Sequence, residues 1–206
     1  MTARIFIDGE AGTTGLQIRA RLDSRADVEV ASLPDDKRKD PVARAEILNG
    51  CDLAILCLPD AAAREAVALI DNPDARVIDA STAHRTADGW TYGFPELDAE
   101  QAGRIAKAKR VANPGCYALA SVAMLRPLIS AGLFPAGHAV TLNAISGYSG
   151  GGRKMIESYE DENAADYTEA PFRVYGLGLE HKHVPEIEVH GGLEKRPLFM
   201  PSVGRF

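Results

Sequence analysis

The sequence has few cysteines and no long apolar run. Its three cysteines, Cys51, Cys57 and Cys116, are odd in number and irregularly spaced, which argues against a disulfide framework and against a zinc site. No apolar stretch is long enough to span a bilayer, and the first residues lack the layout of a signal peptide. We therefore expect a protein of the reducing cytoplasm, with no membrane partner and no bound metal.

Concentrated positive charge is also absent. The formal net charge of the 206 residues is −6, and the longest basic cluster, KRK at 37–39, is interrupted at once by Asp40. Because a nucleic-acid binder usually carries a basic stripe, this charge pattern argues against a nucleic-acid partner. The length suffices for one large domain or two small ones.

Short apolar strands alternate with helical patterns in the first half of the chain. We expect strands at 4–8, 28–32, 53–58, 76–80 and 110–112, and helices near 15–23, 41–48, 61–70 and 98–107. This alternation predicts an α/β fold with a doubly wound parallel sheet, similar to a Rossmann domain, in which 53–58 is a buried central strand.

The pattern changes after Cys116. A helix is expected to about residue 131, then a strand at 140–146, a glycine-rich loop at 147–153 and a charged helix at about 154–163. We place a domain boundary near 113–116, which gives a nucleotide domain at 1–115 and a second, α+β domain at 116–206.

A glycine-rich turn follows the first strand. Glycines at this position allow a tight strand-to-helix turn and let a pyrophosphate approach the helix N-terminus. The spacing departs by one position from the commoner dinucleotide fingerprint, and the alternative is a plain glycine-rich turn. The candidate cofactor-binding residues are Gly9, Gly12, Thr13, Thr14 and Gly15.

The end of the second strand indicates which dinucleotide would bind. An NAD site usually has an acidic residue there, whereas this strand ends in Ser32, with Lys37 and Arg38 shortly beyond. A hydroxyl and nearby cations suit a 2′-phosphate, so we expect NADP (NADPH). The alternative is that Lys37 and Arg38 lie on a solvated loop.

Cys116 is the strongest catalytic candidate. It follows a Pro-Gly turn and opens a helical pattern, which places its thiol at a helix N-terminus. That position favours the thiolate, the form that attacks an acyl carbon. We interpret Cys51 and Cys57 as small buried apolar residues.

His181 and His183 form a second candidate cluster. In an extended segment, residues two apart face the same side, so both rings could point into one site as acid and base. A metal site and two functionless surface histidines are the alternatives. The sequence does not decide which histidine acts.

Two loops are further candidates. Ser81, Thr82 and Arg85 follow the fourth strand, where ligands of open α/β sheets bind, although Ser81 or Thr82 could instead cap a helix. The glycine-rich loop at 147–153 could close over a ligand or be a flexible connection.

Seven motifs together resemble those of the N-acetyl-gamma-glutamyl-phosphate reductases, in their shorter-chain subclass within the semialdehyde dehydrogenase superfamily. They run in family order over essentially the whole chain, and the pairing of NPGCY with HKHVPE is the most specific part. The motifs are IFIDGEAGTTG (5–15), DASTAHR (79–85), YGFPEL (92–97), VANPGCY (111–117), AISGYSGGGR (144–153), HKHVPEI (181–187) and PSVGRF (201–206).

The resemblance implies an activity. NADPH would reduce N-acetyl-L-glutamyl 5-phosphate to N-acetyl-L-glutamate 5-semialdehyde with release of phosphate, in L-arginine biosynthesis. Cys116 would form a thioester, and one of His181 and His183 would act as acid and base. The resemblance also implies a homodimer or homotetramer, Ser81 beside the cofactor, and a substrate site of Arg85, Asn113, Ser146, Gly147, Ser149, Gly150 and Arg153.

The chain departs from the family in length. Family members continue for roughly another hundred residues, as the resemblance has it, so we expect a truncated chain with an incomplete second domain. A strand at 198–203 would then lack neighbours. The alternatives to the reductase are another semialdehyde dehydrogenase, a catalytically dead NADP-binding or assembly module, and a Cys-His hydrolase.

Overall fold

The computed structural model describes residues 2–206, and the backbone divides into two compact units that join between Gly115 and Cys116. The first unit contains a six-stranded sheet and the second a three-stranded sheet. Each unit has its own hydrophobic core.

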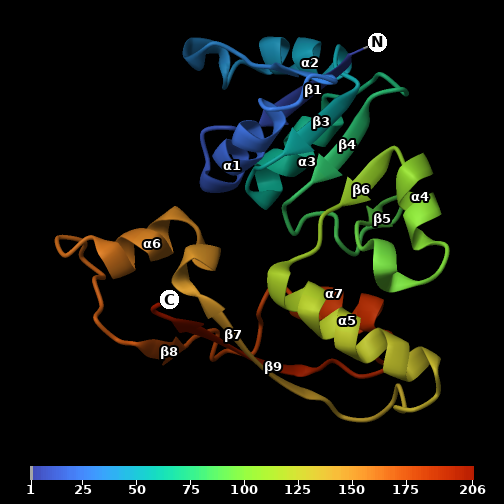
Figure 1. Cartoon of the computed structure of the whole chain (residues 1–206), viewed down its shortest axis with the longest axis vertical. Coiled ribbons are helices and arrows are strands. Elements are labelled where there is room, and N and C mark those ends of the chain that lie inside the picture. Colours follow the sequence, from blue (N-terminus) through green and yellow to red (C-terminus); the bar gives the residue numbers. More distant parts are fainter. Residues whose placement is uncertain (1) are drawn as a thin grey trace. The chain divides into compact units, whose positions relative to one another are not determined.

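The first unit is the doubly wound parallel sheet that the sequence predicts. Its strands lie in the order β2-β1-β3-β4-β6-β5, all neighbours are parallel, and most of this order can be followed in Figure 1. In chain order its elements are β1 (Ala3–Asp8), α1 (Thr13–Leu22), β2 (Val28–Ala31), the 3₁₀ turn η1 (Asp35–Lys37), α2 (Pro41–Asn49), β3 (Leu53–Leu56), α3 (Asp60–Ala68), β4 (Arg76–Asp79), β5 (Thr91–Tyr92), η2 (Pro95–Leu97), α4 (Gln101–Lys107) and β6 (Arg110–Ala112).

The direction of winding reverses beside β1. The chain runs from β1 to β2 on one side and then returns to β3 on the other, so the carboxyl ends of β1 and β3 border a switch point. Ligands of open α/β sheets bind at such a point. Phe6, Ala54 and Leu56 of these strands are buried with Leu48 of α2 and Ala66 of α3. This packing fixes the strands whose carboxyl ends border the switch point.

The expected strands are present with small shifts in their ends. β2 ends at Ala31 and β3 at Leu56, one and two residues earlier than predicted. The sequence pattern does not predict β5, because a two-residue strand carries no periodicity.

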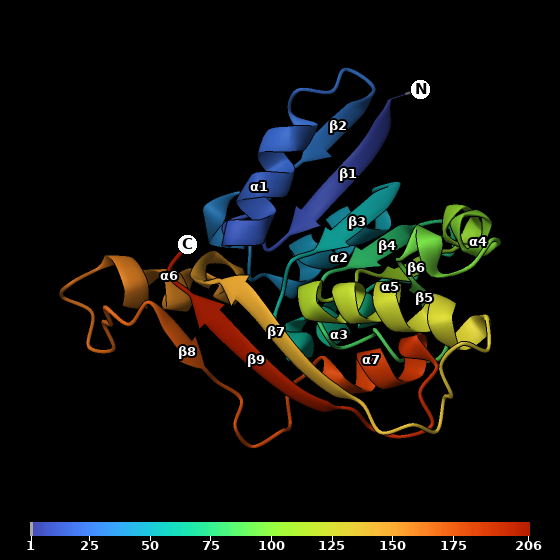
Figure 2. The ribbon, with the colours of Figure 1, turned by 60° about the horizontal axis from the view of Figure 1, so that its bottom comes forward.

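The second unit combines helices with a mixed sheet. Its strands lie in the order β7-β9-β8, with β7 parallel and β8 antiparallel to β9. Figure 2 shows these strands together with the helices of the unit. Its elements are α5 (Cys116–Ser130), β7 (Thr141–Gly147), η3 (Tyr148–Gly151), α6 (Arg153–Glu160), β8 (Phe172–Val174), α7 (Val184–Gly191) and β9 (Leu198–Gly204).

The core of the second unit lies between α5, α7 and β9. Leu125 of α5 and Ile187 of α7 are buried with Phe199 of β9. The helix after Cys116 ends at Ser130, close to the predicted end, and Gly132 follows it with φ +70°, a conformation that glycine adopts easily.

The expectation of an unpaired strand near the end of the chain was wrong. β9 pairs with β7 over seven residues and with β8 on its other edge, so it is the central strand of its sheet. The sequence does not predict β8, since a strand of three residues is too short to show an alternation of apolar and polar residues. No helix within residues 2–206 is both long enough and apolar enough to cross a bilayer.

Candidate functional site

The turn after β1 brings backbone segments very close together. Gly9 has φ +87°, and a Cβ there would lie 2.4 Å from the carbonyl oxygen of Cys57. A Cβ on Gly15 would lie 2.5 Å from the Gly9 oxygen. Gly12 precedes α1 without a side-chain cap, and Thr13 and Thr14 are exposed in the first helical turn. The first backbone N–H groups of α1 are therefore available to an anion.

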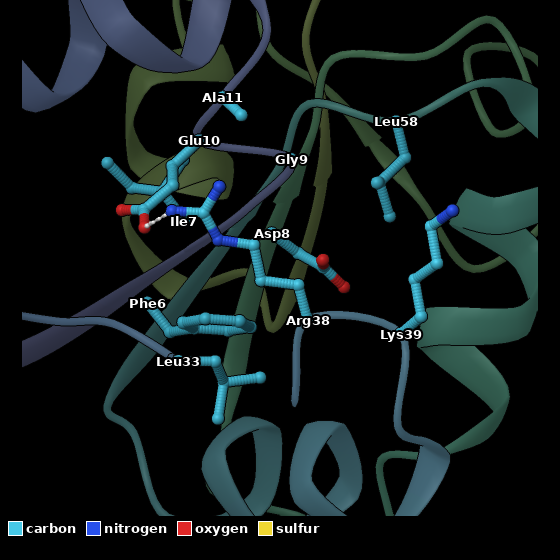
Figure 3. A pocket seen from close by; sticks show the side chains of 10 residues that line it. All are labelled: Phe6, Ile7, Asp8, Gly9, Glu10, Ala11, Leu33, Arg38, Lys39 and Leu58. Carbon is cyan, nitrogen blue, oxygen red and sulfur yellow. Dashed lines mark hydrogen bonds and ion pairs between the residues drawn. The ribbon is translucent and has the colours of Figure 1, made fainter. Parts of the chain in front are cut away.

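An apolar pocket of about 200 Å³ lies beside this turn. Figure 3 shows Phe6 and Leu33 on one side of it and Leu58 on the other, with Arg38 and Glu10 directed toward each other. The pocket is bounded by the carboxyl ends of β1 and β3 and by the segment after β2. Its mainly apolar lining suits an aromatic base.

A second, open recess adjoins the pocket and is lined by polar groups. Arg19 of α1 donates to the hydroxyl of Ser32 at 2.6 Å, and the Ser32 hydroxyl donates to Glu10 at 3.1 Å. Arg38 forms an ion pair with Glu10 at 3.3 Å. Lys37 is exposed at the end of η1 and does not line the recess. Two cations and a hydroxyl therefore converge where β2 ends.

The loop after β4 is organised around a buried carboxylate. Asp79 accepts hydrogen bonds from the Ser81 hydroxyl at 2.7 Å and the Ser81 N–H at 3.0 Å, and it pairs with the His84 ring at 2.6 Å. The Ser81 oxygen in turn accepts from the Ala83 N–H at 3.1 Å. The Ser81 hydroxyl is therefore engaged within the loop, and His84 also stacks on Trp90.

Arg85 joins this loop to the segment that precedes Cys116. Its buried guanidinium donates to the carbonyl of Asn113 at 2.9 Å and to that of Ala80 at 3.0 Å. The Asn113 N–H donates to the Asp79 carbonyl at 2.7 Å, while the Asn113 side chain is exposed. These bonds position the backbone of residues 113–115 at the end of β6.

Cys116 is exposed at the first position of α5, whereas Cys51 is buried and Cys57 is half-buried. Burial raises the pKa of both other thiols, that of Cys57 to about 11. The burial of Cys51 in the core agrees with its interpretation as a small buried apolar residue, whereas Cys57 is only half-buried. Cys116 alone among the three presents its thiol to solvent at a helix N-terminus.

His181 and His183 lie together in the second unit, but not through the strand alternation that the sequence analysis assumed. They sit in a turn before α7, and His183 has helical backbone angles. Their rings are 4.7 Å apart, and each lies within about 6 Å of the Tyr117 ring, next in sequence to Cys116. The turn, rather than an extended segment, therefore brings the two rings toward the start of α5.

The two histidines have different surroundings. The His183 N–H donates to Nδ1 of His181 at 3.2 Å, so the neutral His181 ring carries its proton on Nε2. His183 is buried at the start of α7, whereas His181 is half-buried. Burial, and to a smaller extent the charge of Lys182, lowers the pKa of His181.

Tyrosines complete the surroundings of the histidines. The Tyr117 hydroxyl donates to the Ser202 carbonyl of β9 at 2.9 Å, and the Tyr175 hydroxyl donates to that of Tyr117 at 3.4 Å. Burial is the main cause that raises the pKa of Tyr175, the hydrogen bond with Tyr117 adds to it, and Cys116 lies close enough to contribute. Cys116, Tyr117, Tyr175 and His181 therefore share one environment.

The glycine-rich loop has its own contacts. The Ser146 hydroxyl, near the end of β7, donates to the Gly147 carbonyl at 2.9 Å, and Ser149 and Gly150 lie exposed in η3. Arg153 opens α6, is largely exposed and pairs with Glu157 at 2.7 Å. The loop contacts α6 and Phe206.

Sequence reasoning missed several of these neighbours. No sequence motif marks Glu10 or Arg19 as a site residue, although Glu10 lies within the glycine turn and Arg19 lies one helical turn beyond it. Tyr117 could have been found from its place beside Cys116, whereas Tyr175 and Phe199 come from distant segments. Within residues 2–206, no group of three or more His, Cys, Asp or Glu side chains is arranged to hold a metal ion.

Two family models match the chain. Residues 4–105 match "Semialdehyde dehydrogenase, NAD binding domain", and residues 116–206 match "Semialdehyde dehydrogenase, dimerisation domain". Among solved structures, aspartate semialdehyde dehydrogenase II of Vibrio cholerae aligns with a TM-score of 0.66 at 13% identity, covering 100% of this chain and 71% of that one. The enzyme of Candida albicans, solved with NADP, gives 0.64 at 13% identity, covering 100% and 68%. These likenesses establish a shared fold.

Curated relatives are much more similar in sequence. An N-acetyl-gamma-glutamyl-phosphate reductase from Chelativorans sp. is 61% identical over 207 residues, covering 100% of this chain and 66% of the relative. One from Sinorhizobium fredii is 55% identical, covering 100% and 67%, and N-acetyl-gamma-glutamyl-phosphate reductase 2 from Pseudomonas putida is 57% identical, covering 100% and 65%. The chain thus spans about two thirds of the length of these relatives. It belongs to the N-acetyl-gamma-glutamyl-phosphate reductase family.

Proposed function

We propose that this protein reduces N-acetyl-L-glutamyl 5-phosphate to N-acetyl-L-glutamate 5-semialdehyde with NADPH, releasing phosphate, as a step of L-arginine biosynthesis. The observation that carries the proposal is the exposed Cys116 thiol on the first turn of α5, in one environment with Tyr117 and His181. A helix N-terminus favours the thiolate that acyl transfer requires. The names of the relatives supply the substrate.

NADP is the cofactor that the first unit, residues 1–115, fits best. Gly9 and Gly15 let the turn after β1 pack tightly against neighbouring backbone, and the N–H groups at the start of α1 would hold the pyrophosphate. The pocket beside Leu33 suits the adenine, and Ser32, Arg19 and Arg38 suit a 2′-phosphate. When bound, NADPH supplies the hydride.

The first chemical step belongs to Cys116. Its thiolate attacks the acyl carbon of the substrate, a carbon–sulfur bond forms, and the bond from that carbon to the phosphate oxygen breaks. Phosphate leaves and a thioester remains on Cys116. The free N–H groups in the first turn of α5 are available to the oxygen on the reacting carbon, where negative charge develops.

We assign the acid role to His181 rather than to His183. Nε2 of the neutral His181 ring carries a proton, because Nδ1 accepts the His183 N–H. After hydride reaches the acyl carbon, this Nε2–H stabilises the oxygen that carries the developing negative charge. The carbon–sulfur bond then breaks, the aldehyde leaves, and the thiolate of Cys116 is restored. His183, buried at the start of α7, positions the His181 ring.

We propose that exposed side chains contact the substrate. Arg153, Ser149 and Asn113 are exposed, and a guanidinium such as that of Arg153 suits the carboxylate of the substrate. Ser146, Gly147 and Gly150 shape the loop that carries Ser149 and Arg153. Arg85 supports the backbone before Cys116 through its bonds to carbonyl groups.

The second unit, residues 116–206, is also proposed to carry self-association, in a homodimer or homotetramer. The apolar face of its sheet supports this, as does the match to a dimerisation domain. A cytoplasmic location is consistent with three unbridged cysteines, one of which must stay a thiol to react.

The reverse reaction tests the proposal. With N-acetyl-L-glutamate 5-semialdehyde, phosphate and NADP, we expect nicotinamide absorbance to rise, and Cys116→Ala to abolish turnover while leaving NADPH binding intact. Cys57→Ala, which changes a half-buried thiol, is the matched control and should retain activity. Retained turnover in Cys116→Ala would refute the nucleophile, and preferred turnover of aspartate semialdehyde would refute the substrate.

A further inference from the structure

Glu10 stands between the two arginines of the polar recess. Its carboxylate pairs with Arg19 at 3.2 Å through one oxygen and with Arg38 at 3.3 Å through the other. The first oxygen also accepts the Ser32 hydroxyl. The Glu10 side chain is only 16% exposed, so its charge is enclosed by the groups that would meet a phosphate.

Each of the two arginines also has a second carboxylate partner. Arg19 also pairs with Asp23 at 2.8 Å, and Arg38 with Asp35 at 2.9 Å. The side chains of Asp23 and Asp35 are 53% and 89% exposed, so solvent screens them strongly. The enclosed carboxylate of Glu10 therefore has the largest effect on an anion entering the recess.

The neighbouring carboxylate of the pocket does not share this position. Asp8 is buried and pairs with Arg44 of α2 at 2.7 Å, which balances its charge. Glu10 differs because its partners are the same groups that a phosphate would need. A carboxylate and a phosphate cannot both occupy the arginines without like-charge repulsion at short range.

We propose that Glu10 is a specificity-determining residue that occupies the place of the cofactor's 2′-phosphate and weakens binding of the phosphorylated dinucleotide relative to NAD. The inference rests on the proposed NADP site. Glu10 lies in the turn between Gly9 and Gly12, so its side chain can withdraw as the phosphate takes Arg19, Arg38 and Ser32. Withdrawal breaks the two ion pairs of Glu10, and the lost free energy weakens the binding only of ligands that carry the 2′-phosphate.

Calorimetric titration with two small probes tests the proposal without turnover. 2′,5′-ADP carries the 2′-phosphate, and 5′-AMP lacks it. We expect Glu10→Gln to bind 2′,5′-ADP about tenfold more tightly, as removal of an enclosed like charge predicts, with 5′-AMP changed less than about twofold. Asp35→Asn, which removes the exposed partner of Arg38, is the matched control and should change both probes less than about twofold.

The outcomes separate this inference from the proposed function. If 2′,5′-ADP binds Glu10→Gln no more tightly than the unchanged protein, or more weakly, the inference is wrong, and a preference for 2′,5′-ADP in the unchanged protein would still support NADP. If only Glu10→Gln prefers 2′,5′-ADP, the inference stands and the assignment of NADP falls. If neither protein prefers it, both fall. Urea unfolding checks each variant, and Glu10→Ala replaces Glu10→Gln if the latter does not fold.

Discussion

At the residue scale, the three thiols show how position decides reactivity. Cys51 and Cys57 are removed from solvent to different degrees, and burial raises the pKa of each. Cys116 is exposed where α5 begins, beside Tyr117, whose ring contacts both histidine rings. The same side chain is therefore a core packing group at Cys51, a half-buried thiol at Cys57 and a candidate nucleophile at Cys116.

The pKa of His181 leads to a prediction about pH. A lowered pKa means that the ring stays neutral as the pH falls through about 6.5, the ordinary value for histidine. Because the neutral ring carries the Nε2 proton that we assign to the reaction, activity should persist below pH 6.5 and fall only as Nδ1 is protonated against the His183 N–H. The measurement is the pH profile of kcat.

Variants of the same segment test this assignment. His181→Ala should lower kcat by about 10²–10³-fold, the range for loss of one hydrogen-bond donor to a developing oxyanion. Lys182→Gln removes the charge that also lowers the pKa of His181. It should therefore shift the acid limb of the kcat profile to higher pH while leaving the plateau value of kcat unchanged. An unchanged kcat in His181→Ala would show that this ring has no part in the reaction.

At the element scale, the turn between β1 and α1 depends on Gly9. Alanine there adds the strain of a positive φ and a contact of 2.4 Å between Cβ and the Cys57 oxygen. Gly89→Ala is the matched control, because Gly89 has φ +79° and open space around its Cβ position. Gly89→Ala should lower the free energy of unfolding by about 1–2 kcal/mol, and Gly9→Ala by a further 1–3 kcal/mol from overpacking.

Urea unfolding measures both variants, and titration with 5′-AMP reports on the turn itself. Equal losses of stability in Gly9→Ala and Gly89→Ala would mean that the contact between the new Cβ and the Cys57 oxygen relaxes at little cost in free energy. Binding of 5′-AMP should be weakened only by Gly9→Ala, since Gly89 lies far from the turn in sequence and lines neither the pocket nor the recess.

Elements with a repeating pattern could be predicted from the sequence, and elements made by pairing could not. The parallel strands of the first unit follow from apolar runs separated by helical spacing, and the helix after Cys116 from residues such as Val122 and Leu125. β5 and β8 are two and three residues long and form only because β6 and β9 offer open edges. The local sequence of a short strand does not indicate which strand it will pair with.

The candidate site divides in the same way. Cys116 and the turn glycines are visible in sequence because their chemistry requires particular residues at particular spacings. The arrangement of Glu10, Arg19 and Arg38 depends on three segments meeting around the recess, so no spacing predicts it. The histidines were found for a reason that proved wrong, since a turn and not an extended strand brings their rings together.

At the scale of the whole molecule, one face of the second sheet is apolar and exposed. The register places Leu198 opposite Thr141, and Met200 opposite Asn143, and both apolar side chains are exposed, as is that of Ile145. Phe172 and Val174 of β8 extend the same face, because they pair with alternate residues of β9. Contiguous apolar surface of this kind marks an interaction site, and the proposed partner is a second copy of the chain.

Charge placed on this face should therefore prevent self-association. Ile145 is 63% exposed, so Ile145→Lys should leave folding intact and shift the sedimentation coefficient toward that of a monomer. Leu133→Lys is the matched control, since Leu133 is 75% exposed in the segment after α5 and lies outside the sheet. The two must be compared at equal concentration, because association follows mass action. If Ile145→Lys and Leu133→Lys sediment alike, and both like the unchanged protein, the face is not where copies meet.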